Sequence, residues 1–371
     1  MARCSRSRVT IFLLTMLHIL ACSYLIYLYN TIDSRRQYTP KIDALDVSLY
    51  KPRDEGPLKV SFIEKVDPIK MEDTHTLTKE DLLTIDKVMK ERREKVQQAC
   101  REDPNLSIKS KISQSRLYVN DKLKVLYCFT PKVASTTWTT ILMALDRGIN
   151  ATQIMTSEMA FKKRSKNTNV ALYLWKDWKK SLRKLSLYPP RERDNILKKY
   201  FKMFFVREPF DRLYSAWKNK LNVSTPGYYT EKYGRDILRK YRKNAKVTDI
   251  KHGVGVTFEE FTRYILDINP GRTDPHWQTI QSTCAPCFIN YDIIGNMYDL
   301  DRESQYILSK LGYNDVAMPH LNSMKSAKMD VTKKLKTLPT IPEANMNRIQ
   351  EMYHVDYILS EAIGFKKYPY T

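Results

Sequence analysis

The sequence of 371 residues lacks the patterns that mark several nucleotide- and metal-dependent classes of protein. It has no GxxxxGK[ST] loop and no obvious acidic partner to hold magnesium, which argues against a nucleoside triphosphatase. Asp211, Asp274 and Asp292 are isolated and form no DxD-like motif, which a glycosyltransferase normally needs. The CxxC at Cys284 is accompanied by no second CxxC and no HxxxH, so no metal site is predicted.

Acidic residues are few relative to basic ones. Lys and Arg number 63 against 41 Asp and Glu, a formal net charge of +22. The basic residues are spread over several clusters, namely Lys162–Lys166, Lys176–Lys184, Arg191–Lys202 and Arg239–Lys246. Any one cluster can be a solvated helix face, but together they favour an anionic partner.

The N-terminal region contains an uncharged segment, Thr10–Tyr29, of the length that crosses a bilayer as a helix. Arg3, Arg6 and Arg8 precede it, which favours a cytosolic N-terminus. A cleaved signal peptide is the alternative, but its apolar region is usually shorter and no small-x-small site follows here.

We therefore predict a cytosolic tail at 1–9, a transmembrane signal-anchor at 10–29, a stem at 30–95 and a lumenal domain at 96–371. Nucleic acid is absent from the secretory lumen, so an acidic glycan is the favoured anionic partner. Three Asn-X-Ser/Thr acceptors agree with this location: Asn105, Asn150 and Asn222. Disulfides are expected in an oxidising compartment, and three pairings are open to Cys100, Cys128, Cys284 and Cys287.

Apolar runs alternate with helical patterns through the predicted lumenal domain. Strands are predicted at 122–129, 199–207 and 288–294. Helices are predicted at 78–100, 136–145, 209–221, 257–266, 300–311 and 346–363. This alternation indicates an α/β fold with a central, mostly parallel sheet flanked by helices.

Two strand-to-helix junctions carry the strongest functional signal. At the first, Tyr127–Trp138, an apolar run ends at Pro131-Lys132 and Ser135, Thr136 and Thr137 open a helix. Backbone N–H groups, the positive end of a helix dipole and a lysine suit a phosphate. The alternative is an exposed lysine at an ordinary β–α turn.

At the second junction, Arg207 ends a strand and Ser215 follows two turns into the next helix. The guanidinium fork suits a phosphate, and the serine hydroxyl adds a donor. The alternative makes Arg207 a salt-bridge partner of Glu208 or Asp211. Two such junctions together suggest a ligand with two separate phosphate groups.

These segments resemble a known family. TPKVASTTW looks like the 5′-phosphosulfate loop of the Golgi carbohydrate sulfotransferases, and FFVREPFDRLYSAWKNK looks like their 3′-phosphate segment. The nearest branch is the chondroitin/dermatan 4-O-sulfotransferase and natural-killer-epitope sulfotransferase group. GVTFEEFTRYILD, DPHWQTIQSTCAPCFINYDIIGNMYDL and MYHVDYILSEAIGF follow in the family order, so the resemblance spans about Cys100–Phe365.

The resemblance implies a P-loop-like sulfotransferase fold and the donor 3′-phosphoadenosine-5′-phosphosulfate (PAPS). It implies that Arg207 and Ser215 bind the 3′-phosphate, and that the 5′-phosphosulfate is held by Pro131, Lys132, Val133, Ala134, Ser135, Thr136 and Thr137. The branch usually has Cys-Thr-Asn-Trp where this chain has Ser135-Thr136-Thr137-Trp138. The hydroxyls still donate hydrogen bonds, so binding is expected to persist.

The implied reaction moves a sulfuryl group to a sugar hydroxyl without a metal. Lys132 is predicted to stabilise the charge that builds on the leaving phosphate. His276, in Asp274-Pro-His-Trp277, is the predicted general base, with Glu208 or His252 next in order. The alternative for His276 is a structural histidine packed beside Trp277.

The first expectation for the acceptor is the 4-O position of N-acetylgalactosamine in chondroitin or dermatan. Glucuronic acid 3-O and terminal N-acetylgalactosamine remain alternatives within the branch. A non-catalytic lumenal lectin for acidic glycans is the alternative from another class, but it leaves the two phosphate junctions unexplained. The expected location is the Golgi membrane, as a single-pass type II protein.

Overall fold

The computed structural model describes residues 77–102, 116–148, 178–268, 273–314, 316 and 337–365, which all belong to one unit, Glu72–Thr371. The predicted tail and anchor lie outside the described residues, as do the stem up to residue 76, Asn105 and Asn150. Within those ranges, no helix combines the length and apolarity needed to cross a membrane. The third glycosylation acceptor, Asn222, is exposed.

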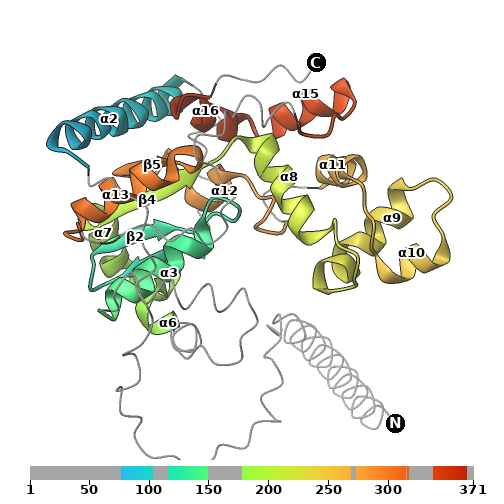
Figure 1. The fold of residues 1–371 in the computed structure, drawn as a ribbon, viewed down its shortest axis with the longest axis horizontal. Coiled ribbons are helices and arrows are strands. Elements are labelled where there is room, and N and C mark those ends of the chain that lie inside the picture. The colour runs from blue at the N-terminus through green and yellow to red at the C-terminus, as the bar shows by residue number, and fades with distance from the viewer. Residues whose placement is uncertain are drawn as a thin grey trace, which may run out of the picture. The chain divides into compact units, whose positions relative to one another are not determined.

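A five-stranded sheet forms the centre of the fold, with the order β3-β1-β2-β4-β5 (Figure 1). Its strands are β1 (Leu117–Asn120), β2 (Val125–Cys128), β3 (Arg183–Lys184), β4 (Phe201–Val206) and β5 (Ile293–Asn296). β2, β4 and β5 run parallel, whereas β1 pairs antiparallel with both β2 and β3.

The sheet is therefore mixed, and the prediction of a mostly parallel sheet was wrong for one edge. A short turn joins β1 to β2, with Lys124 in the left-handed region at φ 54°. Strands joined by so short a turn can pair only antiparallel. The parallel prediction is correct for the three strands that lead into the functional site.

Helices cover the sheet and form a lobe beside it (Figure 1). They are α2 (Lys79–Glu102), α3 (Ser135–Asp146), α6 (Trp178–Ser181), α7 (Pro190–Lys199), α8 (Pro209–Lys220), α9 (Arg235–Tyr241), α10 (Val247–His252), α11 (Phe258–Asp267), α12 (Ile280–Cys284), α13 (Leu300–Lys310), α15 (Glu343–Met352) and α16 (His354–Ala362). The helices predicted at 78–100, 136–145, 209–221, 257–266 and 300–311 are confirmed to within two residues at each end.

Two predicted elements differ from the structure. The helix predicted at 346–363 is interrupted at Tyr353, whose buried hydroxyl donates to the Trp277 carbonyl at 2.5 Å. The strand predicted at 288–294 begins only at Ile293. The residues before it form a turn after Ala285, which adopts the left-handed φ of 46°.

Side-chain alternation along the strands places two apolar clusters on opposite faces of the sheet. Tyr127 and Phe205 pack on one face against α3, where the rings of Phe205 and Trp138 stack with centroids 5.5 Å apart. Leu126 and Phe204 pack on the other face with α7, α12 and α16. Burial on both faces explains why these strands read as continuous apolar runs.

A third cluster fills the lobe formed by α8, α9, α11 and α15, and Trp277 lies at its centre. α8 begins at the carboxyl end of β4 and runs outward into this lobe, as Figure 1 shows. The lobe therefore adjoins the edge of the sheet at which β2 and β4 end.

Two disulfides select one of the three pairings that the sequence left open. Cys100 pairs with Cys287, and Cys128 pairs with Cys284. The first joins α2 to the turn after α12. The second joins the end of β2 to α12, directly before the first junction.

Candidate functional site

The loop at the first junction has an unusual backbone. Lys132 and Ala134 adopt positive φ values of 75° and 60°, in the left-handed region that non-glycine residues rarely occupy. Such strain clusters at ligand-binding sites. Ala134 is also the N-cap of α3, and its side chain makes no capping hydrogen bond. The first turn of α3 thus presents backbone donors that no N-cap side chain occupies.

The predicted ligands in this loop differ in exposure. Lys132 and Ala134 are half-buried, and Thr136 is exposed. The others are buried: Pro131, Val133, Ser135 and Thr137. Lys132, the backbone N–H groups and the Thr136 hydroxyl are therefore the groups most accessible to an anion.

Other cations surround Lys132. Burial is the main cause that lowers the pKa of Lys132 to about 8, and the nearby charges of Arg207 and Lys220 contribute to the same shift. A bound anion would offset this repulsion and restore the ammonium form. The first junction is thus electrostatically suited to a negatively charged group.

The second junction is organised differently. Arg207 is buried, and its guanidinium donates to both carboxylate oxygens of Asp211, from Nε at 2.8 Å and from Nη2 at 2.9 Å. Its Nη1 donates to the Lys132 carbonyl at 3.0 Å. Burial disfavours the charged form of Arg207, but the charge and hydrogen bonds of Asp211 outweigh the effect of burial and raise the pKa of Arg207. Arg207 therefore forms the salt bridge that the sequence offered as the alternative, and it also fixes the first loop.

The N-terminus of α8 is capped by its own chain. The Glu208 carboxylate accepts a hydrogen bond from the Asp211 backbone N–H at 2.6 Å. The expectation that both junctions expose free helix N–H groups was therefore wrong at this capped position. Ser215 lies half-buried in α8. The assignment of Arg207 and Ser215 to a 3′-phosphate stays a prediction.

His276 forms a dyad with Asp274. Its Nδ1 lies 2.7 Å from Asp274 Oδ1, its backbone N–H donates to the same oxygen at 2.9 Å, and the Tyr229 hydroxyl is 3.2 Å from Nδ1. Burial disfavours the Asp274 carboxylate, but hydrogen bonds from His276 outweigh it and lower the pKa. An ionised Asp274 holds the proton of a neutral His276 on Nδ1, which leaves Nε2 as the proton acceptor.

The pKa of His276 lies below 6.5, mainly because the ring is buried. The charges of Lys220 and Lys132 also lower this pKa, whereas the hydrogen bond and charge of Asp274 raise it. Burial and the two lysines therefore favour the neutral imidazole, the form that a general base requires. Lys220 links Lys132 and His276: its ammonium lies 4.5 Å over the Tyr229 ring, whose hydroxyl is 3.2 Å from His276 Nδ1, and its charge also lowers the pKa of Lys132. The position of these groups, at the carboxyl ends of parallel strands, is where open α/β sheets bind ligands.

Sequence reasoning missed Lys220, Tyr229 and the orienting role of Asp274. Lys220 closes the segment FFVREPFDRLYSAWKNK, and Asp274 opens the segment that holds His276, so both stood beside recognised residues. The next candidates for the base are placed differently. Glu208 caps α8 with 2% of its surface exposed, and His252 ends α10 in the lobe.

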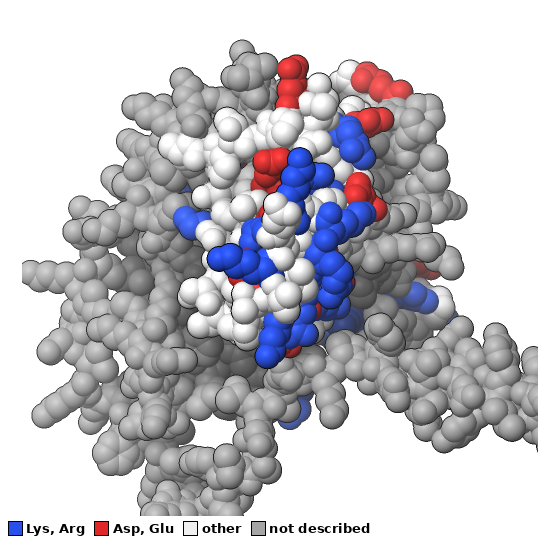
Figure 2. Space-filling view, turned by 90° about the vertical axis from the view of Figure 1, so that its right-hand side faces the viewer, with Lys and Arg blue, Asp and Glu red and all other residues white. Residues whose placement is uncertain are grey.

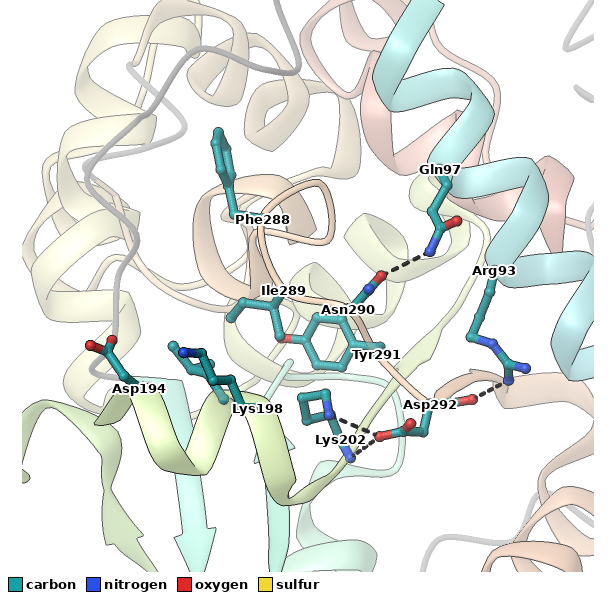
Figure 3. A pocket seen from close by; sticks show the side chains of 11 residues that line it. Arg93, Gln97, Asp194, Lys198, Lys202, Phe288, Ile289, Asn290, Tyr291 and Asp292 are labelled. Atoms are coloured by element: carbon teal, nitrogen blue, oxygen red, sulfur yellow. Dashed lines mark hydrogen bonds and ion pairs between the residues drawn. The ribbon is translucent and has the colours of Figure 1, made fainter. Parts of the chain in front are cut away.

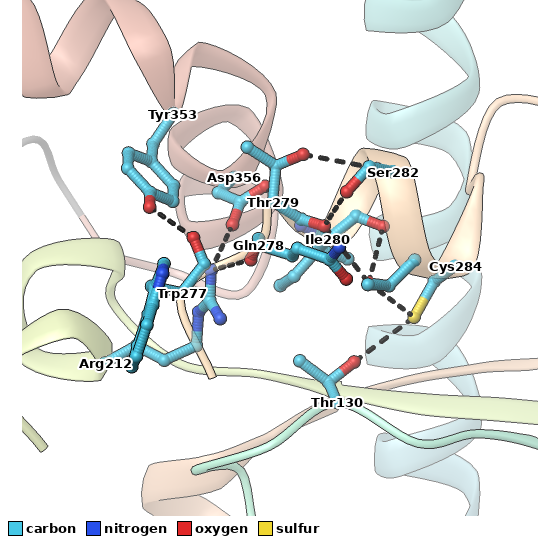
Figure 4. A network of polar contacts seen from close by, with 11 residues as sticks. Thr130, Arg212, Trp277, Gln278, Thr279, Ile280, Ser282, Cys284, Tyr353 and Asp356 are labelled. Carbon is cyan, nitrogen blue, oxygen red and sulfur yellow. Dashed lines mark hydrogen bonds and ion pairs between the residues drawn. The ribbon is translucent and has the colours of Figure 1, made fainter. Parts of the chain in front are cut away.

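A buried polar network fixes the segment that carries His276 (Figure 4). Arg212 donates from Nη2 to Asp356 Oδ2 at 2.9 Å and to the Gln278 carbonyl at 2.7 Å. Asp356 Oδ1 accepts from the Ile280 N–H at 2.8 Å. Burial raises the pKa of Asp356 to about 6 against the opposing charge of Arg212. The network joins α8, α12 and α16 and so positions the dyad.

A cavity of about 610 Å³ lies away from this site, at the amino ends of β4 and β5 (Figure 3). The Lys202 and Arg93 side chains that line it are engaged within the protein. Lys202 Nζ lies 3.2 Å from Asp292 Oδ2, and Arg93 donates to the Asp292 carbonyl at 2.6 Å. The cavity therefore shows no convergence of unsatisfied groups comparable to the one around Lys132.

Comparisons with known proteins agree with this geometry. Residues 115–359 match the sulfotransferase family, and the chain belongs to it. More narrowly, its relatives are carbohydrate sulfotransferases, and the chain is an enzyme of that kind.

Carbohydrate sulfotransferase 11 of Mus musculus is 30% identical over 275 residues, 72% of this chain and 74% of the relative. Carbohydrate sulfotransferase 14 of Danio rerio is 35% identical over 246 residues, 66% of this chain and 61% of the relative. Carbohydrate sulfotransferase 10 of Homo sapiens is 34% identical over 238 residues, 61% of this chain and 62% of the relative. No solved structure matches the chain significantly.

Proposed function

We propose that this enzyme transfers the sulfuryl group of PAPS to a hydroxyl of an anionic glycan, with the 4-O position of N-acetylgalactosamine in chondroitin or dermatan as the acceptor. The observation that carries the proposal is the electrostatic proximity of Lys132 and His276: the charges of Lys132 and Lys220 both lower the pKa of His276, and Lys220 also lowers the pKa of Lys132. The Lys132 ammonium suits the leaving phosphate, and the His276 imidazole suits the attacking hydroxyl.

The first loop fits the 5′ end of the donor. Its backbone donors, the ammonium of Lys132 and the Thr136 hydroxyl would bind the phosphosulfate. Lys132 would stabilise the negative charge that develops on the phosphate oxygen as the bond to sulfur breaks. Ser215 and Arg207 would bind the 3′-phosphate, Arg207 with the donor capacity that its contacts with Asp211 and the Lys132 carbonyl leave.

His276 would act as the base. Nε2 accepts the proton of the sugar hydroxyl while the hydroxyl oxygen attacks sulfur, and Asp274 stabilises the imidazolium that forms. Tyr229, which also contacts Nδ1, helps to orient the ring. No metal has a role in this scheme.

The proposed location is the lumenal side of the Golgi membrane, with Thr10–Tyr29 as the anchor. Two disulfides support an oxidising compartment. The exposed Asn222 supports glycosylation in the lumen. A shift in electrophoretic mobility after glycosidase treatment, smaller in Asn222→Gln than in wild type, would test this placement.

The deciding experiment is transfer of labelled sulfate from PAPS to a panel of desulfated glycans, followed by disaccharide analysis. Label on the 4-O position of N-acetylgalactosamine in chondroitin or dermatan supports the proposal. Label only on glucuronic acid 3-O, or only on terminal N-acetylgalactosamine, would replace the acceptor. Absence of transfer together with retained glycan binding would favour a lectin.

A further inference from the structure

The segment between α8 and α9 has a geometry that the proposed reaction does not explain. Thr230–Gly234 forms a π-helical turn, a rare element that often occurs at functional sites. A Cβ on Gly234 would lie 2.1 Å from the Gly253 carbonyl oxygen, and one on Gly253 would lie 2.0 Å from the Thr230 oxygen. Only glycine at both positions permits this contact, so the π turn is held tightly against α10.

The turn directs its side chains in two directions. Tyr229 and Tyr233 stack with ring centroids 6.0 Å apart and face the site, 5.4 Å from the His276 ring and 5.0 Å from the Trp277 ring respectively. Tyr228 is 51% exposed, which is unusual for so large a side chain. An exposed aromatic ring beside a catalytic dyad is a suitable platform for the apolar face of a sugar.

Lys232 lies beside this platform. Its ammonium donates to the Tyr228 hydroxyl at 2.8 Å and lies 5.2 Å and 5.1 Å from the ring centroids of Tyr228 and Tyr233. The hydrogen bond to the Tyr228 hydroxyl is the main cause that raises the pKa of Lys232, so the group is cationic at neutral pH.

Lys232 differs from three cations farther along the lobe that are paired with carboxylates. Lys240 pairs with Asp267 at 2.7 Å, Arg239 with Asp236 at 2.7 Å, and Arg242 with Glu260 at 2.7 Å. Among the described residues, no carboxylate lies within ion-pair distance of Lys232. Lys and Arg side chains gather on this side of the molecule, as Figure 2 shows. The charge of Lys232 thus stands uncompensated next to an exposed ring.

We propose that Tyr228 and Lys232 form an acceptor subsite, in which Tyr228 stacks on a sugar ring and Lys232 binds an anionic group of the glycan. Lys232 contacts Tyr233, whose hydroxyl donates to Asp274 at 3.4 Å and whose ring packs on Trp277, so at least two side chains stand between Lys232 and the His276 ring. The anionic group therefore belongs to a sugar neighbouring the one that is sulfated. This inference rests on the proposed function and specifies its acceptor as a chain with repeated negative charge.

Lys220 is not part of this subsite. It lies 4.5 Å over the Tyr229 ring, and its charge lowers the pKa of both Lys132 and His276. It is therefore placed to contact the donor as well as the acceptor. Lys232, on the outer side of the turn, is the cleaner residue to test.

The test compares Lys232→Gln with wild type in the full chain, using desulfated chondroitin and its carboxyl-reduced, neutral form as acceptors. We expect KM for desulfated chondroitin to rise about tenfold with kcat retained, and KM for the neutral form to stay unchanged. Lys232→Arg should retain most of the affinity. Lys240→Gln is the matched control, because it removes an exposed lysine of the same lobe that is paired with Asp267.

Two arms identify the groups that bind. Tyr228→Ala should raise KM for both acceptors, because stacking does not require charge. A carboxyl-reduced chain to which sulfate has been added shows which anion binds. If any anion suffices, Lys232→Gln should raise KM for this acceptor. If the subsite requires a carboxylate, KM for this acceptor should be the same in Lys232→Gln and wild type. Equal loss with charged and neutral acceptors in Lys232→Gln, or no loss with either, would overturn the subsite.

Binding to immobilised desulfated chondroitin separates this inference from the proposed function. If wild type binds the glycan and Lys232→Gln binds about tenfold more weakly, the subsite stands even where no sulfate is transferred. If wild type transfers sulfate while both proteins bind and turn over chondroitin equally, the function stands and the subsite fails. Unchanged binding of the desulfated donor product would confirm that the variant is folded.

Discussion

The two strand-to-helix junctions look alike in sequence and differ in structure. Both follow a buried parallel strand, and each has a cation at its start. At the first, the charges of Arg207 and Lys220 lower the pKa of Lys132, and α3 has no capping side chain. At the second, Asp211 neutralises Arg207, and Glu208 caps α8. Local sequence thus identifies a candidate anion site, but nearby carboxylates determine whether the helix start remains open.

Arg207 and Lys132 therefore have different roles. Arg207 is part of the folded core and reaches across to the Lys132 carbonyl, so it holds the first loop in place. Lys132 makes the loop cationic. The following experiments test that division, in order of expected effect.

Arg207→Ala should reduce the free energy of unfolding by about 3–5 kcal/mol, because it leaves Asp211 buried without its partner. Denaturant titration measures the change. Asp211→Asn should act in the same direction, since it strands the guanidinium instead. A stability near wild type in both variants would show that the pair does not hold the junction.

Lys132→Ala should leave stability near that of wild type and reduce sulfate transfer by about 10²–10³-fold, the usual effect of losing one donor to a developing anion. Single-turnover transfer measures it. Lys240→Ala, at an exposed and paired lysine, is the control. Turnover near wild type in Lys132→Ala would remove this residue from the mechanism.

The dependence of kcat/KM on pH should be bell-shaped. His276 acts unprotonated and its pKa lies below 6.5, so activity should fall only as pH drops through that lower value. Lys132 acts protonated and its pKa is about 8, so activity should fall above about pH 8. Lys132→Arg should move the basic limb to higher pH, because guanidinium does not titrate there. An unmoved basic limb would assign it to another group.

The smallest effects concern the helix starts. Glu208→Ala should cost about 0.5–2 kcal/mol, the usual range for loss of a cap. Ala134→Gly should change stability by less than about 1 kcal/mol, because relief of the positive φ offsets the added backbone entropy. Equal losses in the two variants would show that the two helix starts do not differ as described.

Much of the fold followed from local patterns. Helices such as α8 and α13 were placed correctly because their apolar periodicity and starting residues are local. The antiparallel strand β1 and the break at Tyr353 were not. The break coincides with the Tyr353 hydroxyl donating to the Trp277 carbonyl, 76 residues away along the chain, and no local periodicity signals such a contact.

The site shows the same division. Lys132 and His276 were recognised from their own segments, whereas Lys220 and Lys232 became apparent only through the rings and charges around them. The signal for Lys232 is an absence of nearby carboxylates among the described residues. Sequence alone does not show that, because Glu231 stands next to it in the chain yet lies near Arg235, at 3.9 Å.

By itself, the sequence determined the parallel strands, five of the helices and the family to which the chain belongs. Only the tertiary structure decided the disulfide pairing, the capping of the second junction and the dyad that directs His276. The physical reason is the separation along the chain of the groups that interact. Periodicity and helix starts depend on neighbours in the chain, whereas pKa values, ion pairs and disulfides depend on groups that folding brings together from distant segments.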